Sequence, residues 1–246
     1  MRNEVIDLLQ SHRSIRKYKN KPIPDEILEQ ILLSAQWAPS SHNMQSYSII
    51  VVKNKETKRK LRMYCNNQMY VEECPVFLVF CLEMYKHKLV CDMYGTVAQL
   101  NELQNLIVGI GDTALAAQNA LIAARSYGLG GCMIGEIKRH PQKVIELLKL
   151  PPYSFPIMGM CLGYPDDHPW QKPRLPKKAV IHEECYNESN VLEGLKEYEK
   201  ITEDYYTRRT AGKRTEGWGK QMAAYVSQIR NPHLKGDFIK QGFKIT

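Results

Sequence analysis

The sequence predicts an α+β fold, in which helices pack on a sheet within one domain spanning residues 1–246. Residues 75–82 and 157–163 are continuous apolar runs, as expected of strands that are covered on both faces. Around them lie segments in which apolar residues recur at helical spacing, such as residues 27–35. The two kinds of segment alternate too irregularly for repeated βαβ units, so α+β is favoured over a doubly wound parallel sheet.

The amino-terminal quarter contains expected elements in the order helix, helix, strand, helix. Apolar spacing predicts a first helix over residues 4–10. A second begins at Pro24–Asp25–Glu26, because proline is tolerated in a first turn and acidic side chains there complement the helix dipole. Residues 46–53 are rich in β-branched side chains and predict a strand. Residues 55–64 predict a charged amphipathic helix.

The rest of the chain is mainly helical in pattern. We expect a long helix within residues 96–127, with one stripe formed by Ile110, Ala114, Ala117, Leu121 and Ala124. The glycine-rich residues 128–131 end it, and residues 141–150 predict a short helix. The tail, residues 190–246, is polar and helical in pattern with few core residues. Such a tail is typical of an extension that packs across a neighbour or a partner subunit.

Charge favours an anionic partner. The formal net charge is +8 and the pI is about 9.0, a balance that suits nucleic acid, anionic lipid or a phosphorylated cofactor. The basic residues form no single tract, and we find no recognisable nucleic-acid-binding module. A nucleotide-type ligand is therefore the sharper hypothesis. A protein that binds nucleic acid through its basic surface remains the alternative, and it predicts a colourless preparation.

Cysteine usage and the amino terminus favour a cytoplasmic protein. The first five residues lack the apolar stretch of a secretory signal. The most apolar stretch, residues 106–124, is interrupted by Asp112, Gln118 and Asn119, so we expect a buried helix of a soluble protein rather than a membrane span. The seven cysteines contain no C-x-x-C pair, which indicates free thiols in a reducing compartment.

The common signatures of dinucleotide and metal binding are absent from the sequence. Residues 130–135 fail the G-x-G-x-x-G pattern and follow a predicted helix, whereas a Rossmann turn follows a strand. No G-K-[ST] phosphate loop occurs, and residues 182–185 lack the second histidine of H-E-x-x-H. We therefore expect no metal site, and the basic motifs need another explanation.

Three short segments are candidates for binding an anionic, planar ligand. Residues 12–16 (HRSIR) place two guanidinium groups near a hydroxyl donor, which suits a phosphate; taken alone, a solvated basic helix end explains them slightly better. Residues 38–46 supply hydroxyls and amides between a helix and a strand, where they can line a polar ligand. Residues 172–176 (KPRLP) form a rigid basic loop.

Together with the turn ending at Gln45 and the glycines of residues 128–131, these segments resemble the nitroreductase superfamily in identity and order. The resemblance is greatest to the group of NADPH-flavin oxidoreductases and major oxygen-insensitive nitroreductases, and it extends over nearly the whole chain. It implies a central, mainly antiparallel sheet flanked by helices. It also implies a homodimer with FMN at the subunit interface and a helical tail that packs on the partner. Close relatives often carry a longer serine run than Ser40–Ser41, which leaves the shape of the substrate pocket open.

The resemblance also assigns FMN contacts. The phosphate and ribityl chain would be held by Arg13, Ser14, Lys172 and Arg174, with His12 beside them. Arg16 would approach the pyrimidine edge of the flavin, where a fixed cation favours the reduced state because negative charge accumulates there on reduction.

The remaining implied contacts surround the ring. Ser40 and Ser41 would reach the flavin of the other subunit, and Gln68 and Tyr70 would bond or flank the ring. The backbone at Gly130 and Gly131 would face its other side, where glycine permits close approach.

The implied reaction is a ping-pong cycle in which NAD(P)H reduces the flavin and an oxidised acceptor then takes two electrons. Nitroaromatics, quinones, free flavins, azo compounds and metal oxyanions such as chromate are expected acceptors. The cofactor carries the chemistry, so no residue is expected to be a catalytic acid or base. NADPH is favoured as donor because Arg209 and Arg214 occupy the region that engages its 2′-phosphate in the resembling group, although a solvated basic loop would have the same composition. A flavin storage or sensor protein without turnover is the second hypothesis, and a flavin-dismantling or dehalogenating member of the superfamily is the third.

Overall fold

A computed structural model describes residues 3–245. The chain divides into two compact units, of which the first comprises Met1–Pro169 with Asn231–Thr246 and the second Trp170–Arg230.

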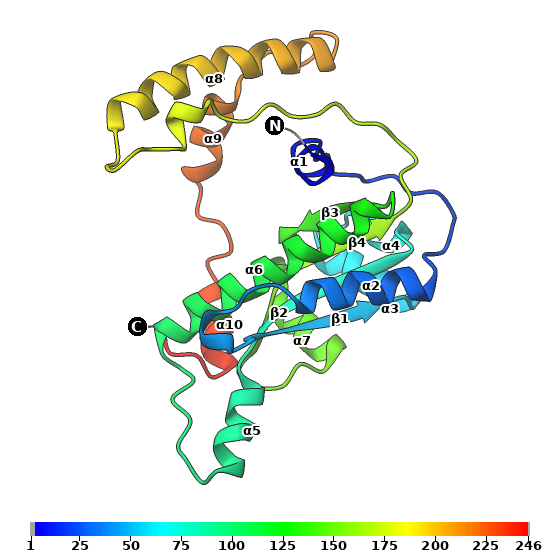
Figure 1. The fold of residues 1–246 in the computed structure, drawn as a ribbon, viewed down its shortest axis with the longest axis vertical. Helices are drawn as coiled ribbons and strands as arrows, with labels where there is room; N and C mark the ends of the chain where they lie inside the picture. Colours follow the sequence, from blue (N-terminus) through cyan, green and yellow to red (C-terminus); the bar gives the residue numbers. More distant parts are fainter. Residues whose placement is uncertain (1–2, 246) are drawn as a thin grey trace. The chain divides into compact units, whose positions relative to one another are not determined.

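The first unit is built on a four-stranded antiparallel sheet (Figure 1). Its strands are β1 (Tyr47–Val52), β2 (Val76–Glu83), β3 (Gly130–Ile134) and β4 (Ser154–Gly163), in the order β1-β2-β4-β3. Strands β2 and β4 confirm the prediction from apolar runs, and β1 confirms the prediction from β-branched residues. The fourth, β3, was not predicted, because it begins with two glycines and its residues read as the end of a helix.

Helices cover both faces of this sheet. The helices of the first unit are α1 (Glu4–Gln10), α2 (Asp25–Gln36), α3 (Lys55–Tyr64), α4 (Met69–Glu73), α5 (Tyr85–Met93), α6 (Leu103–Ser126), α7 (Pro141–Leu148) and α10 (Leu234–Lys240). Local chemistry fixes several of their beginnings. The side chains of Asn3 and Asn54 accept backbone N–H bonds in the first turns of α1 and α3, and Pro141 opens α7.

Alternate residues of β2 enter two different layers of the core. Phe80 and its neighbours two residues apart pack with α2 and α6, while Phe77 and its alternates pack with α3, α4 and α7. Every residue of β2 is buried, which explains why its sequence is continuously apolar rather than alternating. The sheet is therefore the middle layer of an α+β fold, as predicted.

The long central helix corrects two expectations. Residues 96–102 are not helical, since α6 begins at Leu103. Of the predicted stripe, Ala117, Leu121 and Ala124 are buried as expected, but Ile110 and Ala114 are exposed. The first half of α6 instead buries the side that carries Asp112, because an apolar helix gives no single stripe from which its buried side can be chosen.

Among the described residues, α6 is the one helix long and apolar enough to cross a membrane by length and composition alone. Half of its most apolar window is buried inside the protein. Its buried side carries the carboxylate of Asp112, and it packs along α2 and the sheet. These contacts identify it as a core helix of the fold.

The second unit is helical. After an extended, proline-containing segment come α8 (Glu188–Arg209) and α9 (Trp218–Val226). Asn187 caps α8 by accepting the backbone N–H of Asn190 at 3.0 Å. The helical prediction for residues 190–246 is confirmed for these helices and for α10, which belongs to the first unit.

Candidate flavin site

The segment that follows α1 is extended and runs beside β3. The backbone N–H of Ile15 donates to the carbonyl of Gly131 at 3.0 Å, and Tyr18 forms a bridge with Pro165. A Cβ at Gly130 would lie 2.4 Å from Cγ1 of Ile15. Glycine is therefore needed here so that the segment can lie close to the strand, which is a structural reason for the glycine-rich motif.

Arg16, Tyr70 and Cys132 form a cluster at this edge of the sheet. The guanidinium carbon of Arg16 lies 5.9 Å from the centre of the Tyr70 ring, a cation–π distance. Burial lowers the pKa of Arg16, but nearby Cys132 and hydrogen bonding to Tyr70 outweigh it and raise the pKa overall. Burial and Cys132 raise the pKa of Tyr70, and burial raises the pKa of the Cys132 thiol. The site thus carries a fixed positive charge beside neutral partners.

Gln68 stands next to this cluster and has an unused acceptor. Its side-chain Oε1 is buried without a hydrogen-bond partner among the described residues. Asn66 and Asn67, at φ 58° and 54°, turn the chain sharply before α4 and so place Gln68 at the N-cap of that helix. Buried acceptors are nearly always satisfied in native proteins, so Gln68 is poised for a donor from a ligand.

The serine-containing turn between α2 and β1 is tightly constrained. Ser41–Asn43 form a 3-10 turn, and His42, Asn43 and Gln45 all have positive φ, between 50° and 56°. Ser40 closes the turn by accepting the backbone N–H of Gln45 through its Oγ at 3.3 Å. A left-handed backbone conformation is energetically costly for a residue other than glycine, so a contact from another part of the fold must anchor this turn.

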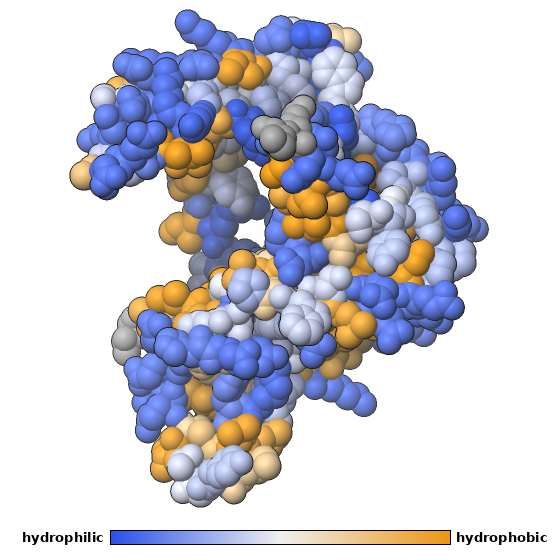
Figure 2. Space-filling model, in the orientation of Figure 1, coloured by the Kyte–Doolittle hydropathy of each residue, from blue (hydrophilic) through white to orange (hydrophobic). Residues whose placement is uncertain are grey.

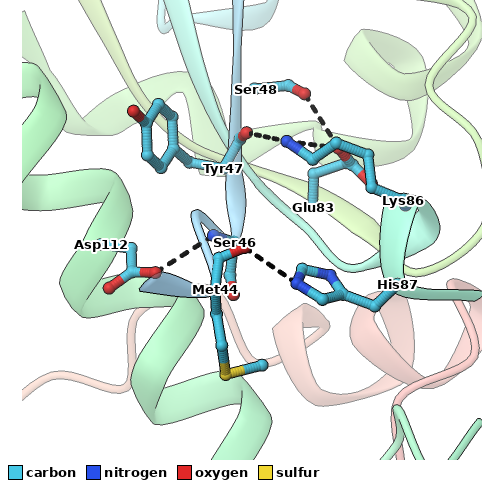
Figure 3. Close-up of polar contacts among 8 residues, drawn as sticks. All are labelled: Met44, Ser46, Tyr47, Ser48, Glu83, Lys86, His87 and Asp112. Atoms are coloured by element: carbon cyan, nitrogen blue, oxygen red, sulfur yellow. Dashed lines mark hydrogen bonds and ion pairs between the residues drawn. The ribbon is translucent and has the colours of Figure 1, made fainter. Parts of the chain in front are cut away.

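That anchor is Asp112 of α6 (Figure 3). Its two carboxylate oxygens accept the backbone N–H groups of Ser41 and Ser46, each at 3.1 Å, so they grip both ends of the turn. Asp112 is only 3% exposed, and a buried carboxylate needs such bonds. Its charge also contributes, after burial, to the raised pKa of Tyr47.

Helix α5 supports the same turn from a second side (Figure 3). A ring nitrogen of His87, Nε2, lies 2.9 Å from the carbonyl oxygen of Met44. Lys86 donates from Nζ to the carbonyl of Tyr47 at 2.7 Å and pairs with the buried carboxylate of Glu83 at 3.1 Å. The predicted flavin-contacting serines are therefore held by residues from two helices and a strand.

Arg13 lies apart from the Arg16 cluster, although both belong to the predicted phosphate motif. Arg16 contacts Tyr70, whereas Arg13 and the buried Ile15 line a pocket that contains neither Arg16 nor Tyr70. The guanidinium of Arg13 lies in a small pocket that also contains Arg125.

The second unit contains the remaining predicted residues. Lys172 and Arg174 line a cavity of about 560 Å³ with Trp170 and Tyr205, and Arg174 donates to the carbonyl of Lys172 at 3.0 Å. Both cations therefore line one pocket.

Arg209 and Arg214 each lie against the ring of a tyrosine of α8. Arg209 stands 5.8 Å from the Tyr205 ring centre, and Arg214 stacks on Tyr206 at 3.5 Å. One guanidinium nitrogen of Arg214, Nη2, is buried without a hydrogen-bond partner among residues 3–245. Arg214 thus keeps an unused donor, which suits an anionic ligand group.

Asp112, Cys132 and Arg125 were not predicted as site residues. Asp112 carried a signal that could have been used, since a carboxylate inside an apolar helix is costly unless it has a specific partner. The other two carried none, because a cysteine in a glycine-rich run and an arginine in a last helical turn are ordinary.

Comparison with known proteins agrees with this geometry. The family model described as the Nitroreductase family matches residues 9–164, and the one described as the Nitroreductase family, C-terminal domain, matches residues 172–246. The chain is 39% identical to an FMN reductase [NAD(P)H] of Bacillus subtilis, over 99% of each chain. It is 36% identical to an NADPH-flavin oxidoreductase of Vibrio harveyi, over 94% of this chain and 95% of that protein.

The fold is shared with solved structures as well. A hypothetical oxidoreductase from Bacillus subtilis superposes with a TM-score of 0.97 at 39% identity, covering 99% of each chain. The match includes the sheet, the helices and both sequence regions that carry the predicted site. The chain therefore belongs to the nitroreductase family.

Proposed function

We propose that the chain is an FMN-dependent oxidoreductase that takes hydride from NAD(P)H and passes two electrons to small oxidised molecules. The observation that carries the proposal is the cationic cluster of Arg16 and Tyr70 beside the unpartnered acceptor of Gln68, in a member of the nitroreductase family. The names of the relatives, which include FMN reductases and an NADPH-flavin oxidoreductase, support the same activity.

The described residues fit FMN. The free Oε1 of Gln68 suits a ring N–H, and the cation of Arg16 suits the pyrimidine edge. By the family resemblance, the phosphate end would be held by His12, Ser14, Lys172 and Arg174, whereas Arg13 lies in a separate pocket with Arg125 and is not assigned to it. Tyr70 would flank the ring, and the backbone of Gly130 and Gly131 lies on the strand beside which the Arg16 segment runs.

When bound, FMN supplies the hydride chemistry, and the protein residues set its environment. Arg16 stays protonated because its pKa is raised, so its charge persists through the cycle and favours the reduced flavin. Asp112 holds the backbone of Ser41 and Ser46, and so fixes the turn whose serines, Ser40 and Ser41, are proposed to reach the partner subunit's flavin. No side chain is assigned as a catalytic acid or base.

The donor is proposed to be NADPH, bound through Arg209 and Arg214. Support comes from the buried, unpartnered Nη2 of Arg214 and from the aromatic rings that support both guanidinium groups. A guanidinium fixed by stacking loses little conformational freedom when it binds a phosphate, which favours a phosphorylated donor.

The working form is proposed to be a cytoplasmic homodimer. Figure 2 shows apolar side chains gathered over α5, where Leu89, Val90 and Met93 are exposed. Further large apolar side chains are exposed along α6, including Leu103 and Ile107. Exposed apolar side chains that gather together are typical of an interface, and a second copy of the chain would cover them.

Steady-state kinetics tests the ping-pong cycle. We expect parallel double-reciprocal plots when NADPH is varied at several fixed concentrations of a nitroaromatic or a quinone, because the donor product leaves before the acceptor binds. Lines that intersect would show that donor and acceptor are bound together, and would contradict the proposed cycle while leaving the oxidoreductase activity in place.

A further inference from the structure

A small basic pocket lies beside the first helix, in the first unit. Its cavity has a volume of about 210 Å³ and is lined by Ser11, Arg13, Arg125 and His168, with Gly128 and Pro165 at its edge. A water molecule occupies roughly 30 Å³ of liquid, so the cavity can hold a group several times that size. No carboxylate lines it.

The two arginines converge on one residue. Arg13 donates from Nη1 to the carbonyl of Ser11 at 3.2 Å, and Arg125 donates from Nη2 to its hydroxyl at 2.8 Å. No ion pair joins either guanidinium to an acid among the described residues, although four other arginines there have such pairs. Each guanidinium carries five N–H donors, so most of their donors remain available.

Arg13 and Arg125 carry the same charge, so their close approach is unfavourable without a counterion. Burial, and then the nearby Arg13, lower the pKa of Arg125. Arg125 lies in the last turn of α6, where the helix dipole favours a cation. The dipole accounts for one arginine at this helix end, but not for a second guanidinium placed against it. An anion between the two would turn their repulsion into attraction.

The pocket borders the candidate flavin site at Gly130, but its basic side chains are different ones. Arg13 lines the pocket, whereas Ser14, Arg16 and Tyr70 do not. Arg16 contacts Tyr70 instead.

We propose that Arg13 and Arg125 bind a phosphate-class oxyanion in this pocket, distinct from the flavin. A tetrahedral dianion accepts bidentate hydrogen bonds from a guanidinium fork, and two forks that meet at Ser11 match it. The chemistry is shared by free inorganic phosphate and by the phosphate of FMN, and the experiment below separates these sources.

The test is calorimetric titration of inorganic phosphate into the FMN-saturated protein at constant ionic strength. We expect one phosphate per protomer, and about tenfold or weaker binding in Arg125→Gln. Arg125→Lys keeps the charge but loses the planar guanidinium, so its phosphate affinity should lie between those of the wild type and Arg125→Gln. Arg59→Gln is the matched control, because Arg59 is exposed and pairs with Glu56 on α3; its phosphate affinity should equal that of the wild type.

FMN affinity of the same variants identifies the source of the anion. Under the proposal, Arg125→Gln binds FMN as tightly as the wild type and loses only the phosphate. Unchanged phosphate binding in Arg125→Gln, or no phosphate binding by the wild type, would overturn the proposal. Weakened FMN binding in Arg125→Gln, with no phosphate bound by the FMN-loaded wild type, would assign the pocket to the flavin and also overturn it. A protein that binds phosphate but no FMN would defeat the proposed function alone.

Discussion

The carboxylate of Asp112 accepts the backbone N–H of Ser46 at 3.1 Å, although the two residues are 66 positions apart in the sequence. The other carboxylate oxygen accepts the N–H of Ser41. One buried side chain of the central helix thus fixes both ends of a turn that contains three non-glycine residues at positive φ. The turn carries the serines that are proposed to reach the flavin.

Asp112→Asn should destabilise the protein. An asparagine can accept only one of the two N–H bonds and presents its own amide donors to the other, so a buried charge-assisted bond is lost. We expect the free energy of unfolding to fall by about 1.5–3 kcal/mol, as measured by urea denaturation. The control is Asp25→Asn, which breaks an exposed ion pair with Lys53 and should change little. Equal effects in the two variants would show that Asp112 is no anchor.

Arg16→Gln should lower the flavin potential. Removing a charge-assisted contact of about 1.5–3 kcal/mol to the reduced flavin corresponds to a shift of roughly 30–60 mV for a two-electron couple. Redox titration with a dye of known potential measures the shift. Arg16→Lys should recover part of it because the charge is kept. A potential in Arg16→Gln equal to that of the wild type would remove Arg16 from the flavin's environment.

The double variant Arg209→Ala, Arg214→Ala should separate the two nicotinamide donors. NADPH carries the 2′-phosphate that the guanidinium groups are proposed to bind, and NADH lacks it. We expect the KM for NADPH to rise about tenfold or more, with the KM for NADH nearly unchanged. The control is Arg208→Ala, which removes an exposed arginine paired with Asp204 on the same helix. A parallel rise for both donors would mean that these arginines do not recognise the 2′-phosphate.

Gly130→Ala should disturb the segment that carries Arg16. The new Cβ would lie 2.4 Å from Cγ1 of the buried Ile15, so the segment must move away from β3. We expect a loss of about 1–3 kcal/mol in stability together with weaker FMN binding. Gly111→Ala is the matched control, because nothing lies within 4 Å of a Cβ there and alanine favours a helix. An alanine at position 130 that behaves like the control would contradict this packing.

Local patterns predicted most of the fold. The strand β2 and the helix α3 could be located because their residues have strand or helix character by themselves. Strand β3 could not, since Gly130 and Gly131 have little strand propensity. Their extended state is imposed by pairing with β4, where Gly131 opposes Leu162, and by the segment that carries Ile15. The start of α6 was missed for a related reason, because the residues before Leu103 have helical composition but no packing partner that the sequence reveals.

The candidate site residues could be named from the sequence, but the contacts that hold them could not. The motif of residues 12–16 and the serines of the turn could be named from the resemblance alone. Two features depend on contacts between segments far apart in the chain. They are the hydrogen bonds between Asp112 and the turn and the proximity of Arg13 to Arg125. The separation of Arg13 from Arg16 also depends on such contacts, whereas the composition of residues 12–16 taken alone slightly favours a basic helix end.

The most direct test of the central claim is the visible absorption spectrum of the purified protein, recorded before and after anaerobic addition of NADPH. We expect a yellow protein with a flavin spectrum that bleaches with NADPH and recovers its colour when a nitroaromatic or a quinone is added. A flavin spectrum that never bleaches would favour a storage or sensor protein. A colourless protein that gains no flavin signal after incubation with FMN would contradict the proposed function.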